Sequence, residues 1–128
     1  MKRFLFVCVE NSNRSQMAEA LARIHGAGKV EAYSAGSRPS GWVNPKAVQA
    51  MNELGYDLTR HRSKSLEDLA GIDFDVAVTM GCGDECPALR AKRRIDWQIP
   101  DPRAMSPEQF RDVRDLIEQK VKELLAEL

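Results

Sequence analysis

The sequence predicts an α/β fold of three layers, in which a four-stranded parallel sheet carries helices on both faces. Short, continuous apolar runs alternate along the chain with segments of helical periodicity, which is typical of successive βαβ units. The chain has 128 residues, and no linker, internal repeat or low-complexity tract interrupts it. We therefore expect one domain over residues 1–128.

Four segments have the composition of strands in such a sheet. Phe4–Cys8 is a continuous apolar run, as found in strands that are buried on both faces. Phe74–Thr79 is predicted to be a third apolar strand. Val30–Ser34 is predicted to be the second strand of the chain, and the short segment Ile95–Ile99 is predicted to be the fourth.

Three segments have the periodicity and the end signals of helices. Ser15–Ile24 places apolar residues at helical spacing and stops before Gly26. A second helix starts at Asn44-Pro45, with a capping residue and a proline at its first position, and ends at Gly55. The last helix opens at Ser106 and carries one apolar stripe to Leu124.

Composition restricts the compartment and the partners. Lys plus Arg and Asp plus Glu number 19 each, so no overall basic field attracts nucleic acid or an anionic membrane. No apolar run reaches the length of a membrane span or a signal-peptide core, and we expect a cytoplasmic protein. Thiols stay reduced there, so Cys8, Cys82 and Cys86 are expected to serve catalysis, metal binding or plain burial rather than a disulfide framework.

Three chemically capable groups follow the carboxyl ends of predicted strands. Cys8 ends the first strand, Cys82 follows the third, and Asp101 follows the fourth. Ligands of open parallel sheets bind beyond these ends of the strands. We therefore expect the three groups to converge on one edge of the sheet.

The segment between the first strand and the first helix reads Cys-Val-Glu-Asn-Ser-Asn-Arg-Ser and is predicted to bind an oxyanion. Backbone N–H groups of such a loop and of a helix N-terminus can point at one anion. The predicted contributors to this cradle are Glu10, Asn11, Ser12, Asn13 and Arg14. Arg14 adds a planar guanidinium that can bind two oxygens at once.

The same positive environment stabilises the thiolate of Cys8 and makes it a nucleophile. Ser15 can donate a hydrogen bond to this thiolate, and the side-chain amide of Asn11 can hold the loop open. The alternative is that Cys8 is merely a buried residue at a strand end and Arg14 a surface residue. The position of the motif between a strand and a helix favours the catalytic interpretation.

Motifs spread along the chain resemble those of one known family. The loop and first helix contain Val7-Cys8, Asn11-Ser12 and Arg14-Ser15-Gln16-Met17-Ala18-Glu19. Further motifs in chain order are Tyr33-Ser34-Ala35-Gly36, Asn44-Pro45-Lys46-Ala47, Val78-Thr79-Met80, Cys86-Pro87 and Asp101-Pro102. Together they resemble the thioredoxin-coupled arsenate reductases, which share the fold of low-molecular-weight protein tyrosine phosphatases. The loop motif alone does not separate the two activities.

The resemblance implies a four-stranded parallel sheet flanked by helices, and three catalytic roles. Cys8 would be the nucleophile, Arg14 would clamp the oxyanion, and Asp101 would give a proton to the leaving oxygen. An oxygen leaves arsenic or phosphorus more easily when it is protonated, and a carboxyl group can supply that proton. From the residues alone, Asp101 is equally well interpreted as a turn residue before Pro102.

Additional thiols distinguish a reductase from a phosphatase. Water suffices to cleave a phosphocysteine, whereas a reductase needs another thiol to attack the adduct of Cys8 and arsenic. The resemblance implies that Cys82 attacks Cys8 and releases arsenite, leaving a Cys8–Cys82 disulfide. Cys86 would then form a Cys82–Cys86 disulfide, which thioredoxin would reduce.

We therefore predict an arsenate reductase that binds arsenate or a similar oxyanion such as phosphate, holds no cofactor or metal, and uses an external thiol reductant. Because only three residues separate Cys82 from Cys86, glutaredoxin or a low-molecular-weight thiol could replace a thioredoxin-type protein. The alternative is a low-molecular-weight protein tyrosine phosphatase. It is less favoured because Arg103-Ala104-Met105 follows Pro102, where phosphatases of this fold usually carry aromatic residues.

Two positions depart from the family pattern. Glu10 stands where relatives usually have glycine, so its carboxylate should point outward or pair with a base such as Arg38. Some relatives bind potassium behind the loop through residues that follow a histidine, and here Lys64 follows His61. Our hypothesis is that the Lys64 ammonium replaces the ion and reaches Asn11 and Ser34 to support the loop. Otherwise Lys64 would be a solvated surface charge.

Two classes other than enzymes compete with this interpretation. The three cysteines could bind a soft metal or arsenite in a sensor, although no DNA-binding element accompanies them. The chain could also be a redox-regulated interaction module with an idle loop, which only Glu10 favours. The basic run Arg90–Arg94 is interpreted as a solvated face, with docking of a reductant protein or attraction of oxyanions as the alternative.

Overall fold

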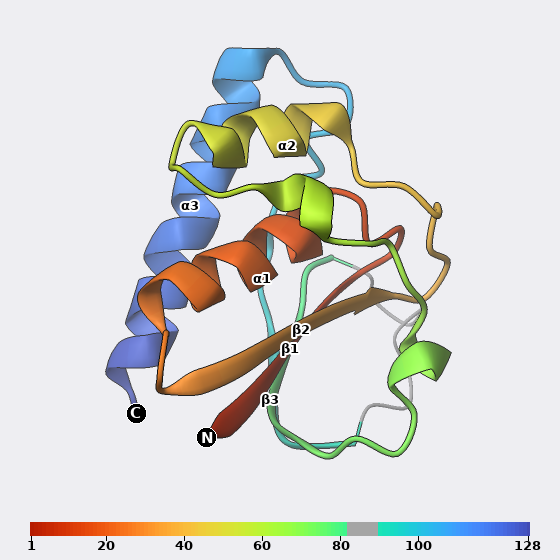
Figure 1. Ribbon diagram of the computed structural model, residues 1–128, viewed down its shortest axis with the longest axis vertical. Coiled ribbons are helices and arrows are strands. Elements are labelled where there is room, and N and C mark those ends of the chain that lie inside the picture. Colours follow the sequence, from red (N-terminus) through yellow and green to blue (C-terminus); the bar gives the residue numbers. More distant parts are fainter. Residues whose placement is uncertain (82–89) are drawn as a thin grey trace.

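The computed structural model describes residues 1–81 and 90–128. Its elements are β1 (Lys2–Cys8), α1 (Arg14–His25), β2 (Val30–Gly36), α2 (Pro45–Asn52), the short 3-10 helices η1 (Leu58–Arg60) and η2 (Leu66–Leu69), β3 (Phe74–Thr79), β4 (Ala91–Asp96) and α3 (Pro107–Ala126). Helices separate β1 from β2 and β2 from β3, and α3 follows β4 at the end of the chain (Figure 1).

The four strands form one sheet in the order β2-β1-β3-β4, and all neighbouring strands are parallel. Val7 of β1 is paired with Ala35 of β2 on one side and with Thr79 of β3 on the other. The carboxyl ends of these strands therefore lie at the same edge of the sheet. The predicted parallel α/β fold is confirmed.

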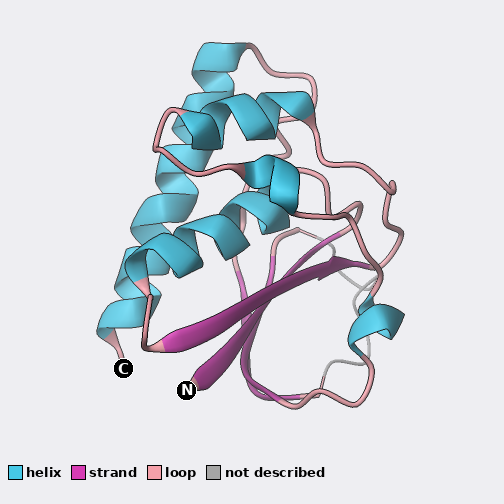
Figure 2. Cartoon of the chain, in the orientation of Figure 1, coloured by secondary structure: helices cyan, strands magenta, loops and turns pink. Residues whose placement is uncertain are grey.

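Alternate residues of β1 belong to two separate cores. Phe4 and Phe6 face a large core that includes residues of α1, α2 and α3. Leu5 and Val7 face a smaller core whose partners include Leu66 and nearby apolar residues of the segment around η2. Figure 2 shows the long helices gathered on one side of the sheet, with η2 away from them. Among the described residues, the second face is thus covered by a 3-10 helix and its flanking loops.

The helix signals of the sequence correspond to real caps. The side chain of Asn44 accepts a hydrogen bond from the backbone N–H of Lys46 at 2.9 Å, and Pro45 opens α2. Ser106 and Gln109 form a reciprocal capping box at the start of α3. Patterns of local capping residues are sufficient to locate these starts because the partners lie within three residues.

The fourth strand was predicted at the wrong place. It covers Ala91–Asp96, whereas the predicted segment Ile95–Ile99 leaves the sheet after Asp96. Among the described strands, β4 lies at the edge of the sheet and is paired only with β3, and most of its side chains are exposed. The basic run therefore forms a strand through backbone pairing, and Trp97 and Ile99 are buried just beyond the strand. Charged side chains are tolerated on edge strands, where they disfavour unwanted pairing.

Within the described ranges, no helix combines the length and the apolar character that crossing a bilayer would require. Cys82 and Cys86, the two predicted relay thiols, lie outside the described residues.

Candidate active site

A pocket of about 340 Å³ lies where β1 passes into α1. It is lined by Cys8, Val9, Glu10, Ser12, Asn13, Arg14, Gly81 and Asp101. Cys8 is 3% exposed and ends β1, Gly81 follows β3, and Asp101 follows β4. The structure thus brings Cys8, the predicted loop and Asp101 together at the carboxyl edge of the sheet.

The carbonyl groups of the loop bind neighbouring segments of the chain and so fix the loop backbone. The carbonyl oxygens of Val9, Glu10 and Ser12 accept hydrogen bonds from the backbone N–H groups of residues 38, 40 and 44 at 2.9–3.1 Å. The carbonyl of Asn11 accepts one from Gln16 at 3.1 Å. In a trans peptide the next N–H points opposite to the carbonyl, so the N–H groups of residues 10–13 are turned toward the inside of the loop. With the N-terminus of α1, these groups make a site for an oxyanion.

The thiol of Cys8 ends a chain of side-chain hydrogen bonds. Its sulfur lies 2.9 Å from the hydroxyl oxygen of Ser15, and the side-chain N–H of Asn11 donates to that same oxygen at 2.7 Å. Because Asn11 supplies the donor to Ser15, the Ser15 hydroxyl proton is free to be donated to Cys8. All three side chains are buried, so this arrangement can hold a thiolate in place.

Asn11 is fixed by further contacts on its opposite side. Its side-chain oxygen accepts hydrogen bonds from Gln16 Nε2 at 2.8 Å and from the backbone N–H of Lys64 at 3.0 Å. Asn11 also has a positive φ of 50°, a conformation that asparagine adopts more readily than most residues. Gly36 lies close by, and a Cβ there would approach the Val9 carbonyl oxygen to 2.5 Å. The loop can therefore pack on the end of β2 only because residue 36 is glycine.

Gln16 connects Asn11 with a buried histidine. Gln16 donates through Nε2, so its Oε1 accepts from Nδ1 of His61 at 2.9 Å. The other ring nitrogen of His61 lies 2.6 Å from the hydroxyl of Tyr56, which can donate to it. Burial lowers the pKa of His61 below its ordinary value of 6.5, which favours the neutral ring that these bonds require.

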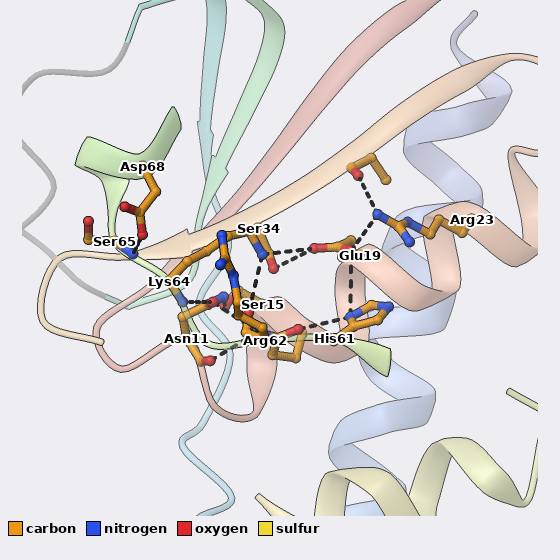
Figure 3. A network of polar contacts seen from close by, with 12 residues as sticks. Asn11, Ser15, Glu19, Arg23, Ser34, His61, Arg62, Lys64, Ser65 and Asp68 are labelled. Atoms are coloured by element: carbon orange, nitrogen blue, oxygen red, sulfur yellow. Dashed lines mark hydrogen bonds and ion pairs between the residues drawn. The ribbon is translucent and has the colours of Figure 1, made fainter. Parts of the chain in front are cut away.

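Behind the loop, the buried carboxylate of Glu19 gathers four polar partners (Figure 3). The Ser34 hydroxyl donates to it at 2.6 Å, and the Arg23 guanidinium lies 2.8 Å away. Lys64 Nζ lies 3.8 Å from the same carboxylate, and His61 Nδ1 lies 3.5 Å from it. Burial lowers the pKa of Lys64, while Glu19 acts in the opposite direction.

The contacts predicted for the Lys64 ammonium, with Asn11 and Ser34, are wrong. The contact with Asn11 is made by the backbone N–H of Lys64, and the ammonium meets Glu19, to which Ser34 is bonded. The Lys64 side chain is 16% exposed, so it is not a solvated surface charge. Lys64 and Ser34 are thus joined through Glu19, a residue to which the sequence analysis gave no role.

Arg14 is positioned by the segments that follow β3 and β4. Its Nη1 donates to the carbonyl oxygen of Ile99 at 3.0 Å, and its side chain is 11% exposed. Gly81 has a φ of +78°, and a Cβ at this position would lie 2.9 Å from Arg14 Nη1. The guanidinium thus occupies space that a side chain at residue 81 would take.

Asp101 stands at the mouth of the pocket. Its side chain is 52% exposed, and Oδ2 lies 4.0 Å from Arg14 Nη2. Its other oxygen accepts the backbone N–H of Arg103 at 3.1 Å. The carboxyl group therefore lies within reach of both solvent and an anion held by Arg14, as the predicted proton donor must.

Glu10, which lines the pocket, is paired with a base. Its Oε1 lies 2.9 Å from Nη1 of Arg103, two residues after Asp101. Glu10 has no positive φ, since Asn11 is the non-glycine residue with that conformation among those described. The carboxylate is therefore compatible with the loop, although Arg103 was not the partner that the sequence suggested.

A cavity of about 360 Å³ lies on the opposite face of the sheet, remote from Cys8 in the arrangement of the strands. Its lining is largely apolar, from Leu5 to the residues around η2, with Glu67 and Arg90 at its border. The described residues of this lining include no nucleophilic side chain.

Several residues of this site had no predicted role. Gln16, Glu19 and Tyr56 complete the support behind the loop, and Arg103 completes its mouth. Gln16 and Glu19 are three positions apart on α1 and so lie on one helical face. This spacing is the sequence feature from which their shared role could have been predicted. For Arg103 the sequence contained no comparable signal.

Comparison with known proteins gives consistent results. The family of low molecular weight phosphotyrosine protein phosphatases matches residues 3–128. The glutaredoxin arsenate reductase of a Synechocystis species is 40% identical over 131 aligned positions, which cover 100% of this chain and 99% of that protein. A solved arsenate reductase in a phosphate-binding state superposes with a TM-score of 0.91 at 39% identity, covering 99% of this chain and 98% of the other.

A second solved structure, the thioredoxin-dependent arsenate reductase of Corynebacterium glutamicum, has a TM-score of 0.81 at 30% identity. The alignment covers 99% of this chain but 61% of that one. The names of these two relatives thus include two different reductant proteins, glutaredoxin and thioredoxin.

Proposed function

This chain belongs to the low molecular weight phosphotyrosine protein phosphatase family, and within that family we propose that it is an arsenate reductase whose nucleophile is Cys8. The observation that carries the proposal is the pocket that Cys8 and Arg14 line together with Val9, Glu10, Ser12 and Asn13 of the loop. Relatives named arsenate reductase match the chain over almost its whole length. The catalytic domain would comprise residues 1–128.

In the first step, the thiolate of Cys8 attacks arsenic in a bound arsenate. Arg14 and the N–H groups of residues 10–13 hold the oxyanion and stabilise charge on its oxygens during the attack. One arsenic–oxygen bond breaks, and the leaving hydroxyl takes a proton from Asp101 and departs as water. Ser15 donates its hydrogen bond to the thiolate before the attack.

In the following steps, thiols deliver two electrons to arsenic. Cys82 attacks the sulfur of Cys8, the sulfur–arsenic bond breaks, and its electron pair stays on arsenic, which leaves as arsenite. The Cys8–Cys82 disulfide is then opened by Cys86, which forms a Cys82–Cys86 disulfide and frees the Cys8 thiolate. An external thiol reductant reduces this last disulfide.

The reductant would be a thioredoxin-type protein, a glutaredoxin or a low-molecular-weight thiol in the cytoplasm. Support comes from the names of the relatives, one called glutaredoxin arsenate reductase and another thioredoxin-dependent. No bound cofactor enters the proposed reaction, because every electron comes from a thiol.

The second candidate is hydrolysis of phosphate monoesters through a phosphocysteine. The family description favours it, and the same loop, Arg14 and Asp101 would serve that reaction. The two candidates differ in their need for Cys82 and Cys86, which hydrolysis does not use.

The decisive experiment measures arsenite release from arsenate, coupled to thioredoxin, thioredoxin reductase and NADPH. Glutaredoxin with glutathione is tested in parallel. Wild type is compared with Cys8→Ser, Cys82→Ser and Cys86→Ser, and hydrolysis of p-nitrophenyl phosphate is followed in the same samples.

Turnover that is lost in all three variants would support the three-thiol relay. Activity that survives in Cys86→Ser with glutathione would restrict the relay to Cys8 and Cys82. Hydrolysis of the aryl phosphate through Cys8 without any arsenite from the wild type would make the protein a phosphatase and refute the proposed relay.

A further inference from the structure

The rim of the pocket contains a continuous run of contacts from the loop to Asp101. Arg103 Nη1 lies 2.9 Å from Glu10 Oε1, and the backbone N–H of the same arginine donates to Asp101 at 3.1 Å. Glu10 and Asp101 both line the pocket. Arg103 therefore joins two residues of the pocket lining, one that precedes α1 and one that follows β4.

We propose that the ion pair between Glu10 and Arg103 makes the site prefer small inorganic oxyanions over phosphate monoesters that carry an aryl group. The inference rests on the proposed oxyanion site around Cys8. It concerns which anions that site admits and is independent of the relay thiols.

A substituent on the bound anion has to leave the pocket toward solvent. Cys8 lies at the buried end, and Asp101, which is half exposed, lies at the mouth. The oxygen that Asp101 can reach is therefore the one that points outward. In arsenate or phosphate that oxygen carries at most a proton, whereas in an aryl ester it carries a ring.

The ring would have to pass the rim beside Asp101, where Arg103 extends to Glu10. Both side chains of the pair are partly exposed, with 66% exposure for Arg103 and 40% for Glu10. Residues 103–105, Arg-Ala-Met, provide no aromatic surface that would compensate by stacking on the ring. Binding of the aryl ester therefore requires the free energy of breaking the ion pair, whereas binding of the inorganic anion does not.

Because Glu10 and Arg103 carry opposite charges, their removal should change the affinity for anions in different ways. Glu10 is the one acidic residue in the segment 8–15, and Arg103 offsets its charge beside the anion site. Removal of Arg103 leaves the carboxylate unpaired and disfavours every anion. Removal of Glu10 opens the rim and also removes the repulsion.

The test uses NMR titration of the reduced, full-length protein with inorganic phosphate and with phenyl phosphate. Wild type is compared with Glu10→Ala and Arg103→Ala, which both keep the backbone N–H that binds Asp101. The control is Arg93→Ala, which removes an equally exposed ion pair at 2.8 Å between β4 and the end of α3. The amide spectra verify that each variant is folded.

We expect the preference for phosphate over phenyl phosphate to fall by roughly two- to fivefold in both rim variants, the factor that corresponds to one exposed ion pair. The affinity for phosphate itself should fall only in Arg103→Ala. An unchanged preference in both rim variants, or an equal change in Arg93→Ala, would overturn the inference while leaving the proposed site intact. Failure of the wild type to bind phosphate would overturn both.

Discussion

The hydroxyl oxygen of Ser15 lies 2.9 Å from the sulfur of Cys8, seven residues earlier in the chain. Cys8 ends β1 and Ser15 belongs to the first turn of α1, so the contact closes the loop between them. Since Asn11 donates to the same oxygen at 2.7 Å, the serine proton is directed at the thiol. This geometry supports the role proposed for Cys8.

Replacement Ser15→Ala should therefore slow the reaction of Cys8 with iodoacetamide at pH 7 by about tenfold, because a hydrogen bond to a charged group contributes roughly 1.5–3 kcal/mol. Alkylation of Cys8 is quantified by peptide mass spectrometry, which separates it from Cys82 and Cys86. The control is Ser106→Ala, which removes the cap of α3 far from the thiol. An unchanged rate in Ser15→Ala would show that the hydroxyl does not stabilise the thiolate.

Gly81→Ala should weaken phosphate binding as well as folding. The new Cβ would meet Arg14 Nη1 at 2.9 Å and would also sit at a φ of +78°. Gly28→Ala is a matched control, since Gly28 has a φ of +80° and open space around it. Both variants should lose about 1–2 kcal/mol of unfolding free energy from the left-handed backbone.

Only Gly81→Ala should bind phosphate less tightly in the NMR titration. Equal phosphate affinities in the two variants would mean that Arg14 adjusts to the methyl group without loss.

Exchange of potassium for sodium should leave the activity and thermal midpoint of the wild type unchanged, because the Lys64 ammonium lies 3.8 Å from the buried carboxylate of Glu19. In Lys64→Met this cation is lost, and we expect a lower thermal midpoint that potassium partly restores. Differential scanning fluorimetry in matched potassium and sodium chloride measures both effects. A strong potassium requirement of the wild type would contradict the hypothesis for Lys64.

Acid should destabilise the fold through His61. Burial lowers its pKa below 6.5 in the folded chain, so the unfolded chain takes up the proton first as the pH falls. The free energy of unfolding should therefore decline from about pH 6.5 downward until the folded-state pKa is passed, with a slope of at most about 1.4 kcal/mol per pH unit. Above that range this histidine should contribute no pH dependence.

Urea unfolding of wild type and His61→Gln between pH 5 and 8 measures this slope. The glutamine can still donate to Gln16, but it does not titrate, so the variant should have the shallower dependence. Identical slopes would show that His61 is not the group responsible.

Much of the site could be predicted because its chemistry is local in sequence. The run from Cys8 to Ser15 contains the proposed nucleophile, the loop and the arginine within one βα junction. Asp101 could be assigned to the same edge because parallel strands place their carboxyl ends together. Confirmation of the parallel sheet and of the family supports both steps.

The position of β4 could not be obtained in the same way. Ala91–Asp96 lacks an apolar pattern because an edge strand with exposed side chains needs none, and its pairing with β3 is made by the backbone. Ile95, Trp97 and Ile99 alternate with polar residues as in a strand, but Trp97 and Ile99 are buried beyond the end of β4. Burial without sheet pairing cannot be distinguished from a strand by periodicity alone.

The sequence by itself determined the α/β class, the helix starts and the position of the loop between β1 and α1, because apolar periodicity and capping depend on neighbours a few positions apart. The tertiary structure alone decided the partners of the charged and amide side chains. Gln16 meets His61 across 45 positions, and Glu10 meets Arg103 across 93. Such pairs arise where separate segments of the chain cross at the edge of the sheet, and no local pattern of residues specifies them.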